Sequence, residues 1–263
     1  MSDDIENYIK NYDNLTKKLI YHFEYGMGGI GDYFKFFIYT LRYCMNNNIK
    51  LYLSIDHDLD RYVRLKYDKM YINRNNLNYI TLNKYKDLEN IDDKNIYLVY
   101  PFLFYDVQKE VYENAIISKL EDLFYFTDDI IINLPKEKYI SMHLRLGDKY
   151  LETDKNFIVC KDDERFYNEL KLNKFIEDNK DKNIYFFCDN YTFKKNIKHK
   201  YSYINIIDVK IGHTSLLNIT KDEIKNSIIE FYILSKSEKI YWVSWSGFSL
   251  MASRFFITKY SEI

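Results

Sequence analysis

The residues most suited to chemistry lie close together between positions 139 and 149, in the sequence YISMHLRLGDK. The apolar start of this stretch predicts a buried strand. His143, Arg145 and Asp148 follow, and Gly147 permits a sharp turn. Open α/β sheets bind ligands at the carboxyl ends of their strands, and a guanidinium suits phosphate oxygens. The stretch therefore predicts a diphosphate site, although a surface turn in which Arg145 pairs only with Asp148 fits so short a motif equally well.

Two further predicted strands also end in polar residues. Strand 184–188 is followed by Asp189, and strand 239–243 runs through the sequence SWSGFS into a helix. Parallel strands end at one edge of a sheet, so we expect these residues to meet Arg145 there. N–H groups at a helix start bind phosphate oxygens, whereas the alternative for SWSGFS is an ordinary helix cap. Convergence of three strand ends favours the phosphate site, with contributions from Ser244, Ser246 and Gly247.

The first half of the chain has a glycine cluster, GMGGIGD, at positions 26–32. It separates a predicted strand at 19–25 from a predicted helix at 33–45, and a second strand follows at 49–55. This order is typical of the opening unit of a dinucleotide-type fold. The spacing of these glycines matches neither the Walker A motif nor GxGxxG. The turn therefore either allows close helix packing or faces a ligand that is bound across a cleft. The glycines concerned are Gly28, Gly29 and Gly31.

Both halves of the chain alternate predicted strands and helices. We expect a helix at 102–126, a strand at 203–209 and an amphipathic helix at 221–236. We place a boundary in the stretch 127–138, which gives an N-terminal domain of residues 1–132 and a C-terminal domain of residues 133–263. Successive units of this kind predict an α/β protein with two Rossmann-like domains facing across a cleft.

Composition excludes several function classes. The 263 residues carry a net charge of −1, which gives no basic field for nucleic acid or an anionic membrane. No stretch approaches the roughly 20 apolar residues of a membrane span. Cys44, Cys160 and Cys188 are isolated and odd in number, so we expect a reducing, cytoplasmic location.

No metal site is evident in the sequence. The five histidines lack HExxH or paired spacing. His57, between Asp56 and Asp58, could form a DxD-like metal motif, but we favour a solvated loop.

Two segments resemble motifs of the α1,2-, α1,6- and protein O-fucosyltransferase superfamily. Residues 143–149, HLRLGDK, resemble its HxRxGD motif. Residues 28–32, GGIGD, resemble its GGxGN motif, with Asp32 in place of the usual Asn. That replacement leaves an acceptor-side role for position 32 open.

Two more segments of the second half extend the resemblance. Residues 187–190, FCDN, are similar to the family's (S/T)DD strand end, with Cys188 as a departure. Glu230 lies in a segment similar to the family's D-x-x-x-L-S helix, and Ser246, sixteen residues later, begins a segment similar to its SxFS turn. The resemblance covers much of residues 139–256 and a short piece of the first half.

The resemblance implies a GT-B fold and an inverting transferase that uses GDP-fucose as donor, with no metal or other cofactor. The second domain would bind the donor, and the first would face a glycan acceptor. The implied contacts are Arg145 with the β-phosphate; His143, Asp148 and Lys149 around the donor's sugar and ribose; Asp189 at the donor site; Glu230 with guanine; and Ser246, Gly247 and Phe248 with the diphosphate.

The acceptor hydroxyl also needs a base on the opposite side of the sugar. Glu152 is the first candidate, followed by Asp148 and Asp32, although a solvated charge explains Glu152 equally well. Two other hypotheses stay open: transfer of another GDP- or UDP-linked sugar, and a non-catalytic nucleotide-binding relative of the same fold. The acceptor, the linkage and the oligomeric state are not predicted.

Overall fold

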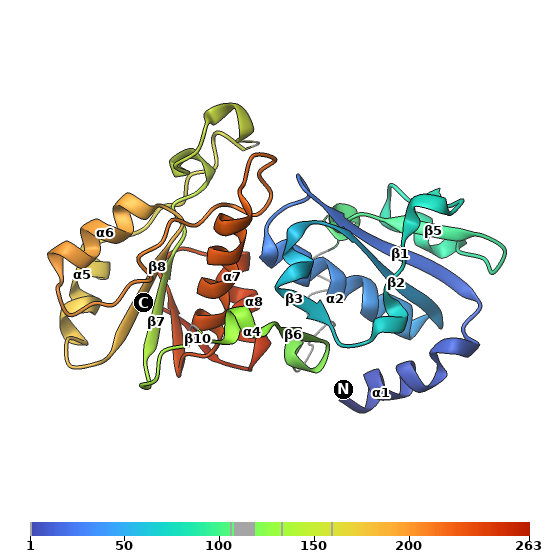
Figure 1. Cartoon of the computed structure of the whole chain (residues 1–263), viewed down its shortest axis with the longest axis horizontal. Coiled ribbons are helices and arrows are strands. Elements are labelled where there is room, and N and C mark those ends of the chain that lie inside the picture. Colours follow the sequence, from blue (N-terminus) through green and yellow to red (C-terminus); the bar gives the residue numbers. More distant parts are fainter. Residues whose placement is uncertain (1, 106, 108–118, 133, 159) are drawn as a thin grey trace.

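The computed structural model describes residues 2–105, 107, 119–132, 134–158 and 160–263. It consists of two lobes, each built on a four-stranded parallel sheet (Figure 1). The strand order is β2-β1-β5-β4 in the first lobe and β10-β9-β7-β8 in the second. The strands of the first sheet are β1 (Lys17–Glu24), β2 (Ile49–Asp56), β4 (Ile80–Thr81) and β5 (Ile96–Val99). Those of the second are β7 (Ile140–Leu144), β8 (Ile184–Cys188), β9 (Lys239–Trp242) and β10 (Lys259–Glu262).

Helices and a small antiparallel ladder complete the described fold. β3 (Val63–Leu65) pairs with β6 (Phe124–Phe126). The α-helices are α1 (Ser2–Asn11), α2 (Ile30–Asn46), α4 (Asp128–Ile131), α5 (Glu169–Asp178), α6 (Tyr191–Lys200), α7 (Lys221–Ser235) and α8 (Gly247–Phe255). Short 3-10 helices occupy Tyr12–Asn14, Asp58–Arg61, Asp68–Met70, Arg74–Asn76, Tyr85–Asn90, Pro101–Phe104, Leu120–Asp122, Asp148–Tyr150 and Lys155–Phe157.

The central strands of the two sheets lead into the predicted site segments. β1 lies between β2 and β5, and β7 lies between β9 and β8, so both strands need apolar side chains on both faces. Five consecutive residues of β1 and four of β7 are buried, although His22, Ser141 and His143 among them are polar. β1 ends at Glu24, just before the glycine cluster, and β7 ends at Leu144, just before Arg145. The two parallel sheets confirm the predicted α/β class.

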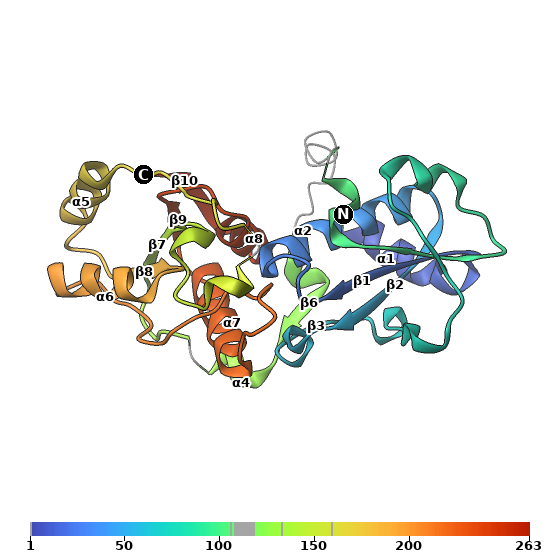
Figure 2. The same ribbon diagram turned by 90° about the horizontal axis from the view of Figure 1, so that it is seen from above.

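A buried aromatic cluster joins the two lobes. Phe34 of α2 stacks on Phe231 of α7 and meets Phe255 of α8 edge-on, with ring centroids 5.4 and 5.7 Å apart. Phe126 of β6 packs on Phe255 at 4.6 Å. Figures 1 and 2 show α2 of the first lobe beside α7 and α8 of the second. A contact this apolar stabilises one relative position of the lobes.

Two predicted elements need correction. Residues 203–209 do not form a strand, because the pairing with β8 is limited to Asn205, whose N–H donates to the Ile184 carbonyl and whose carbonyl accepts the Phe186 N–H, each at 2.8 Å. The predicted helix at 102–126 was wrong at its described ends, which contain 3-10 turns and strand β6, whereas residues 106 and 108–118 lie outside the described residues. We retain the boundary near residue 132 as a proposal.

The described residues include no helix that is both long and apolar enough to cross a membrane.

Candidate functional site

A cavity of about 370 Å³ lies between the two lobes. The first lobe contributes the start of α2, from Gly29 to Lys35. The second lobe contributes the ends of β7 and β8, the start of α8, part of α7 and the loop at 211–214. The cavity therefore lies where both sheets present the carboxyl ends of their strands, which is the usual position of ligands in open α/β sheets.

The N-termini of α2 and α8 meet at this cavity. A Cβ atom on Gly31 would lie 2.5 Å from the carbonyl carbon of Gly247 and 2.7 Å from the nitrogen of Phe248, so only glycine permits this approach. Each helix start carries a partial positive charge. Two like ends in contact repel each other, and an anion between them would remove that cost. The arrangement is therefore suited to a phosphate group.

Asp32 fixes the glycine turn in front of α2. Its Oδ2 accepts the N–H of Gly29 at 3.2 Å, and its Oδ1 pairs with Lys35 Nζ at 3.0 Å. Gly28 has a φ of +96°, a conformation in which a side chain is strained, and a Cβ there would meet the Asp32 carboxylate at 2.8 Å. Gly29, Gly31 and Asp32 line the cavity, which supports a ligand-facing turn as well as helix packing.

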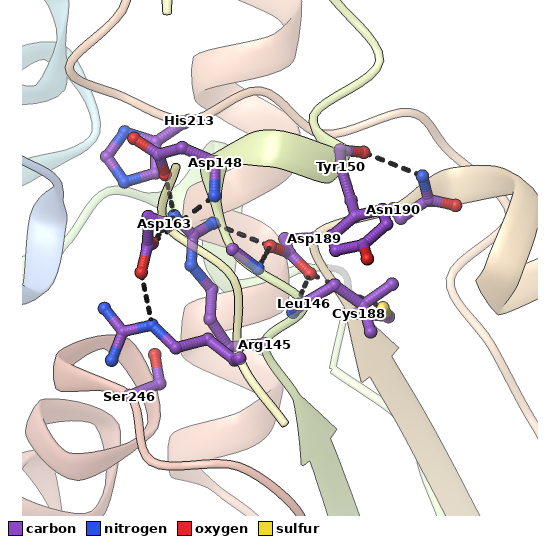
Figure 3. Close-up of polar contacts among 12 residues, drawn as sticks. Arg145, Leu146, Asp148, Tyr150, Asp163, Cys188, Asp189, Asn190, His213 and Ser246 are labelled. Carbon is purple, nitrogen blue, oxygen red and sulfur yellow. Dashed lines mark hydrogen bonds and ion pairs between the residues drawn. The ribbon is translucent and has the colours of Figure 1, made fainter. Parts of the chain in front are cut away.

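Arg145 is held by carboxylates from three segments (Figure 3). Its Nη1 donates to Asp189 at 2.8 Å, its Nη2 pairs with Asp148, and Asp163 lies 3.8 Å from Nη2. Asp189 also accepts the backbone N–H groups of Leu146 at 2.8 Å and of the following glycine at 3.0 Å, so it shapes the turn after β7. The pairing of Arg145 with Asp148 is present, but the Arg145 side chain is only 12% exposed and lines the cavity. A solvent-exposed turn is thereby excluded.

The ion pairs around Arg145 also limit its electrostatic contribution. Arg145 and Arg165 face the carboxylates Asp148, Asp163 and Asp189, so the cluster has no excess of positive charge. Burial raises the pKa of Asp148, while Arg145 lowers it, and the net shift is upward. Arg145 therefore supplies N–H groups in a fixed geometry, and the helix starts supply the positive potential.

His143 lies deeper in the same cavity. Its ring stacks on Phe248 with centroids 5.4 Å apart, and its Nδ1 is buried without a partner among the described residues. Burial, together with Arg145, lowers the pKa of His143 to about 3. The imidazole is therefore neutral and has a nitrogen that a ligand or water could satisfy.

Glu230 and Lys194 form a buried ion pair at the α7 side of the cavity. Lys194 Nζ lies 2.5 Å from Glu230 Oε1 and donates to the carbonyl of Val209 at 3.0 Å. Glu230 lines the cavity, and its Oε2 has no partner within the described part of the chain. Burial raises the pKa of Glu230 to about 7, against the effect of Lys194. A buried, unsatisfied carboxylate oxygen costs free energy that N–H donors of a ligand would recover.

Other predicted residues make contacts that support the fold around the site. The Ser244 hydroxyl accepts the Arg145 N–H at 2.9 Å and donates to its carbonyl at 2.6 Å, which ties β9 to β7. Ser246 caps α8 by accepting the Phe248 N–H at 3.2 Å, and it also lines the cavity. Lys149 pairs with Glu164 at 2.7 Å and is half exposed, outside the cavity lining.

Glu152 also lies outside the cavity lining. Its two oxygens accept the N–H groups of Tyr191 and Thr192, each at 3.0 Å, at the start of α6. This is the position of a helix-capping carboxylate. Among the three candidate bases, Asp32 lines the cavity, whereas Asp148 and Glu152 do not.

The loop that bridges the lobes was not predicted. Thr214 Oγ1 accepts the N–H of Ile30 at 2.9 Å, and its carbonyl accepts His57 Nε2 at 2.8 Å. The Ser215 carbonyl accepts the N–H of Gly26 at 3.0 Å. His57 thus links the two lobes. Within the described ranges, no group of His, Cys, Asp or Glu side chains could hold a metal ion. Such long-range contacts have no local motif that sequence inspection could detect.

Comparisons with solved structures identify the fold. A mutant of Arabidopsis thaliana FUT1 in complex with GDP matches with a TM-score of 0.56 and 12% identity, over 97% of this chain and 73% of that chain. NodZ α-1,6-fucosyltransferase soaked with GDP-fucose matches with a TM-score of 0.55 and 9% identity, over 91% of this chain and 92% of that chain. The same enzyme co-crystallised with GDP matches with a TM-score of 0.53 and 10% identity, over 90% of this chain and 91% of that chain. No family model matches the sequence, and no curated protein sequence does. The chain thus has the GT-B fold of these fucosyltransferases, and the resemblance noted in the sequence is confirmed for the fold.

Proposed function

We propose that the protein is an inverting glycosyltransferase that transfers fucose from GDP-fucose to a hydroxyl of a glycan. The observation that carries the proposal is the cavity lined by two helix N-termini, by Arg145 and by Glu230, whose Oε2 has no partner among the described residues. The structural neighbours that share the fold were solved with GDP or GDP-fucose, which supports the same donor here.

The helix starts and Arg145 suit the diphosphate of the donor. During transfer the bond between the sugar's anomeric carbon and the β-phosphate oxygen breaks, and negative charge grows on the leaving GDP. Fixed N–H groups that point at this oxygen stabilise the charge without rearranging, and the effect is usually large. The starts of α2 and α8 supply such groups next to Arg145, so we propose that the reaction needs no metal ion.

Glu230 suits the guanine base. Guanine presents two adjacent N–H donors, and one carboxylate oxygen of Glu230 is held by Lys194 while the other is unpartnered among the described residues. Uracil and adenine lack this pair of donors on one edge. A buried acceptor left unpaired by the wrong base gives strong discrimination. This is why we favour a GDP-sugar over a UDP-sugar.

Asp32 is the carboxylate that we propose as the base. It lines the cavity from the first lobe, on the side expected for the acceptor. The acceptor hydroxyl would attack the anomeric carbon and lose its proton to the Asp32 carboxylate, which inverts the configuration. Asp32→Asn keeps an oxygen for the Gly29 N–H but removes the basic group. We expect transfer to fall at least about 10²-fold while GDP still binds. Unchanged transfer would exclude Asp32 as the base.

Calorimetry with GDP, UDP and ADP tests the donor first. Of the three nucleotides, we expect only GDP to bind tightly. We also expect GDP-fucose to be turned over in the presence of simple sugars without added metal. Tight UDP binding would instead favour another nucleotide sugar. GDP binding without hydrolysis or transfer on a glycan array would favour a non-catalytic relative. We also propose a cytoplasmic location, because the three cysteines are unpaired.

A further inference from the structure

His213 occupies a position that the proposed mechanism does not yet use. It belongs to the loop through which the second lobe binds the glycine turn of the first, and it lines the cavity. The neighbouring Thr214 is anchored at both its hydroxyl and its carbonyl. The backbone next to His213 is therefore fixed against the first lobe.

The Cε1–Nε2 edge of the His213 ring faces the start of α2. Both atoms lie 3.4 Å from the position that a Cβ atom on Gly29 would occupy. This places Nε2 beside the helix start that faces the cavity. Figure 3 draws His213 with the carboxylates that hold Arg145, and Arg145, Asp32 and Asp163 all affect the titration of the ring.

The contacts of the other ring nitrogen indicate which tautomer is present. The N–H of Ser215 donates to His213 Nδ1 at 3.4 Å, and the Ser215 hydroxyl oxygen lies 2.5 Å from the same nitrogen. The direction of the backbone N–H favours a lone pair on Nδ1 and a proton on Nε2, whereas the Ser215 hydroxyl can donate to Nδ1 or accept from it. Burial and Arg145 lower the pKa of His213 to about 3, so a second proton is absent at neutral pH.

The Nε2–H group has no hydrogen-bond partner among the described residues, although His213 lines the cavity. A donor beside a helix start is suited to an acceptor that carries negative charge. We propose that His213 donates its Nε2–H to a diphosphate oxygen of the bound nucleotide, so that the bridging loop closes the anion site from the side of the first lobe. This inference rests on the proposed function, because it assumes a nucleoside diphosphate in the cavity.

Nitrogen-15 NMR of the histidine rings and titration with GDP test the inference together. In the wild type we expect a neutral His213 ring with its proton on Nε2, and a shift of that resonance when GDP binds. His213→Ala should weaken GDP binding roughly tenfold to a hundredfold, as expected for one bond to a charged group. His213→Gln, whose amide can also donate, should recover part of this loss. Guanosine, measured by competition, should bind all three proteins equally.

The outcomes separate this inference from the proposed function. A proton on Nδ1 would overturn the inference, and so would equal GDP affinity in the wild type and His213→Ala. In either case, GDP binding by the wild type would still uphold the proposed function. An equal loss of guanosine affinity would show that the substitution disturbs the whole cavity, and would also overturn it. If the wild type does not bind GDP, both proposals fail.

Discussion

Each lobe has an Arg–Asp pair three residues apart just after a strand of its sheet, but the two pairs have different surroundings. Arg61 and Asp58 follow β2, and the Arg61 side chain is 60% exposed. Arg145 and Asp148 follow β7, and the Arg145 side chain is 12% exposed because Asp189 of the neighbouring strand end also binds it. An Arg–Asp pair of this spacing is a surface ion pair in one lobe, whereas in the other lobe, where the two residues come in the opposite order, its arginine lines the cavity. The neighbouring strands, not the motif, decide which.

Removal of the two arginines is the strongest test of this difference. Arg145→Ala should lower turnover of GDP-fucose at least about 10²-fold, because it removes a donor aimed at developing charge. Arg61→Ala should change turnover by less than about twofold, since an exposed ion pair contributes little. Steady-state kinetics on both variants gives the comparison.

Arg145→Lys, measured in the same experiment, separates the effect of the donor geometry of Arg145 on turnover from the effect of its charge. Lysine keeps the positive charge near the three carboxylates but lacks the planar set of donors. We expect Arg145→Lys to fold like the wild type, as seen by circular dichroism, but to have the low turnover of Arg145→Ala. Wild-type turnover in Arg145→Ala would refute the role of this residue.

Glu230 provides the next test, on affinity. Glu230→Gln should weaken GDP binding about tenfold or more, because one acceptor for guanine is lost, and should leave UDP binding unchanged. The matched control is Glu24→Gln in the first lobe, where the carboxylate pairs with His22 and Arg74 at the end of β1. Calorimetry should show no effect of the control on GDP. Equal losses for GDP and UDP in Glu230→Gln would contradict guanine recognition.

The same residue predicts a pH dependence. Burial raises the Glu230 pKa to about 7, so the carboxylate that guanine needs is lost as the pH falls through 7. GDP affinity should therefore decline from pH 8 to pH 6 in the wild type. A phosphate group also titrates in this range, so the informative quantity is the difference between the wild type and Glu230→Gln. Parallel pH profiles would show that Glu230 does not face the base.

The edge of the second sheet was easier to predict from the sequence than the junction of the lobes. Arg145 and Asp189 meet as expected, because parallel strands with polar ends must bring those ends together. Asp163 and the loop around His213 were not predicted, because their contacts depend on how distant segments fold and have no spacing pattern. The contacts of Glu152 with the start of α6 were not predicted either, because its position near a motif in sequence says nothing about the direction of its side chain.

The contact between Gly31 and Gly247 allows a stability test with an internal control. A Cβ on Gly31 would collide with the backbone of α8, whereas a Cβ on Gly247 would meet no atom within 4 Å. Gly31→Ala should therefore lower the free energy of unfolding by about 1–3 kcal/mol, and Gly247→Ala should change it little. Urea denaturation of the ligand-free proteins measures both. Equal values would show that the two helix starts are not in contact.

The smallest effect is expected at Glu152, which lies near the site but outside the cavity lining. Burial raises its pKa, but bonds from Thr192 and Tyr191 outweigh burial and lower that pKa, which makes the group a weaker base. Glu152→Gln should leave the pH–rate profile unchanged and lower the free energy of unfolding by about 0.5–1 kcal/mol, as for a helix cap. Glu223→Gln, which changes the capping carboxylate of α7, should give a similar loss. A displaced acidic limb in Glu152→Gln alone would make Glu152 the base in place of Asp32, and the boundary between the cavity wall and its structural support would have to include α6.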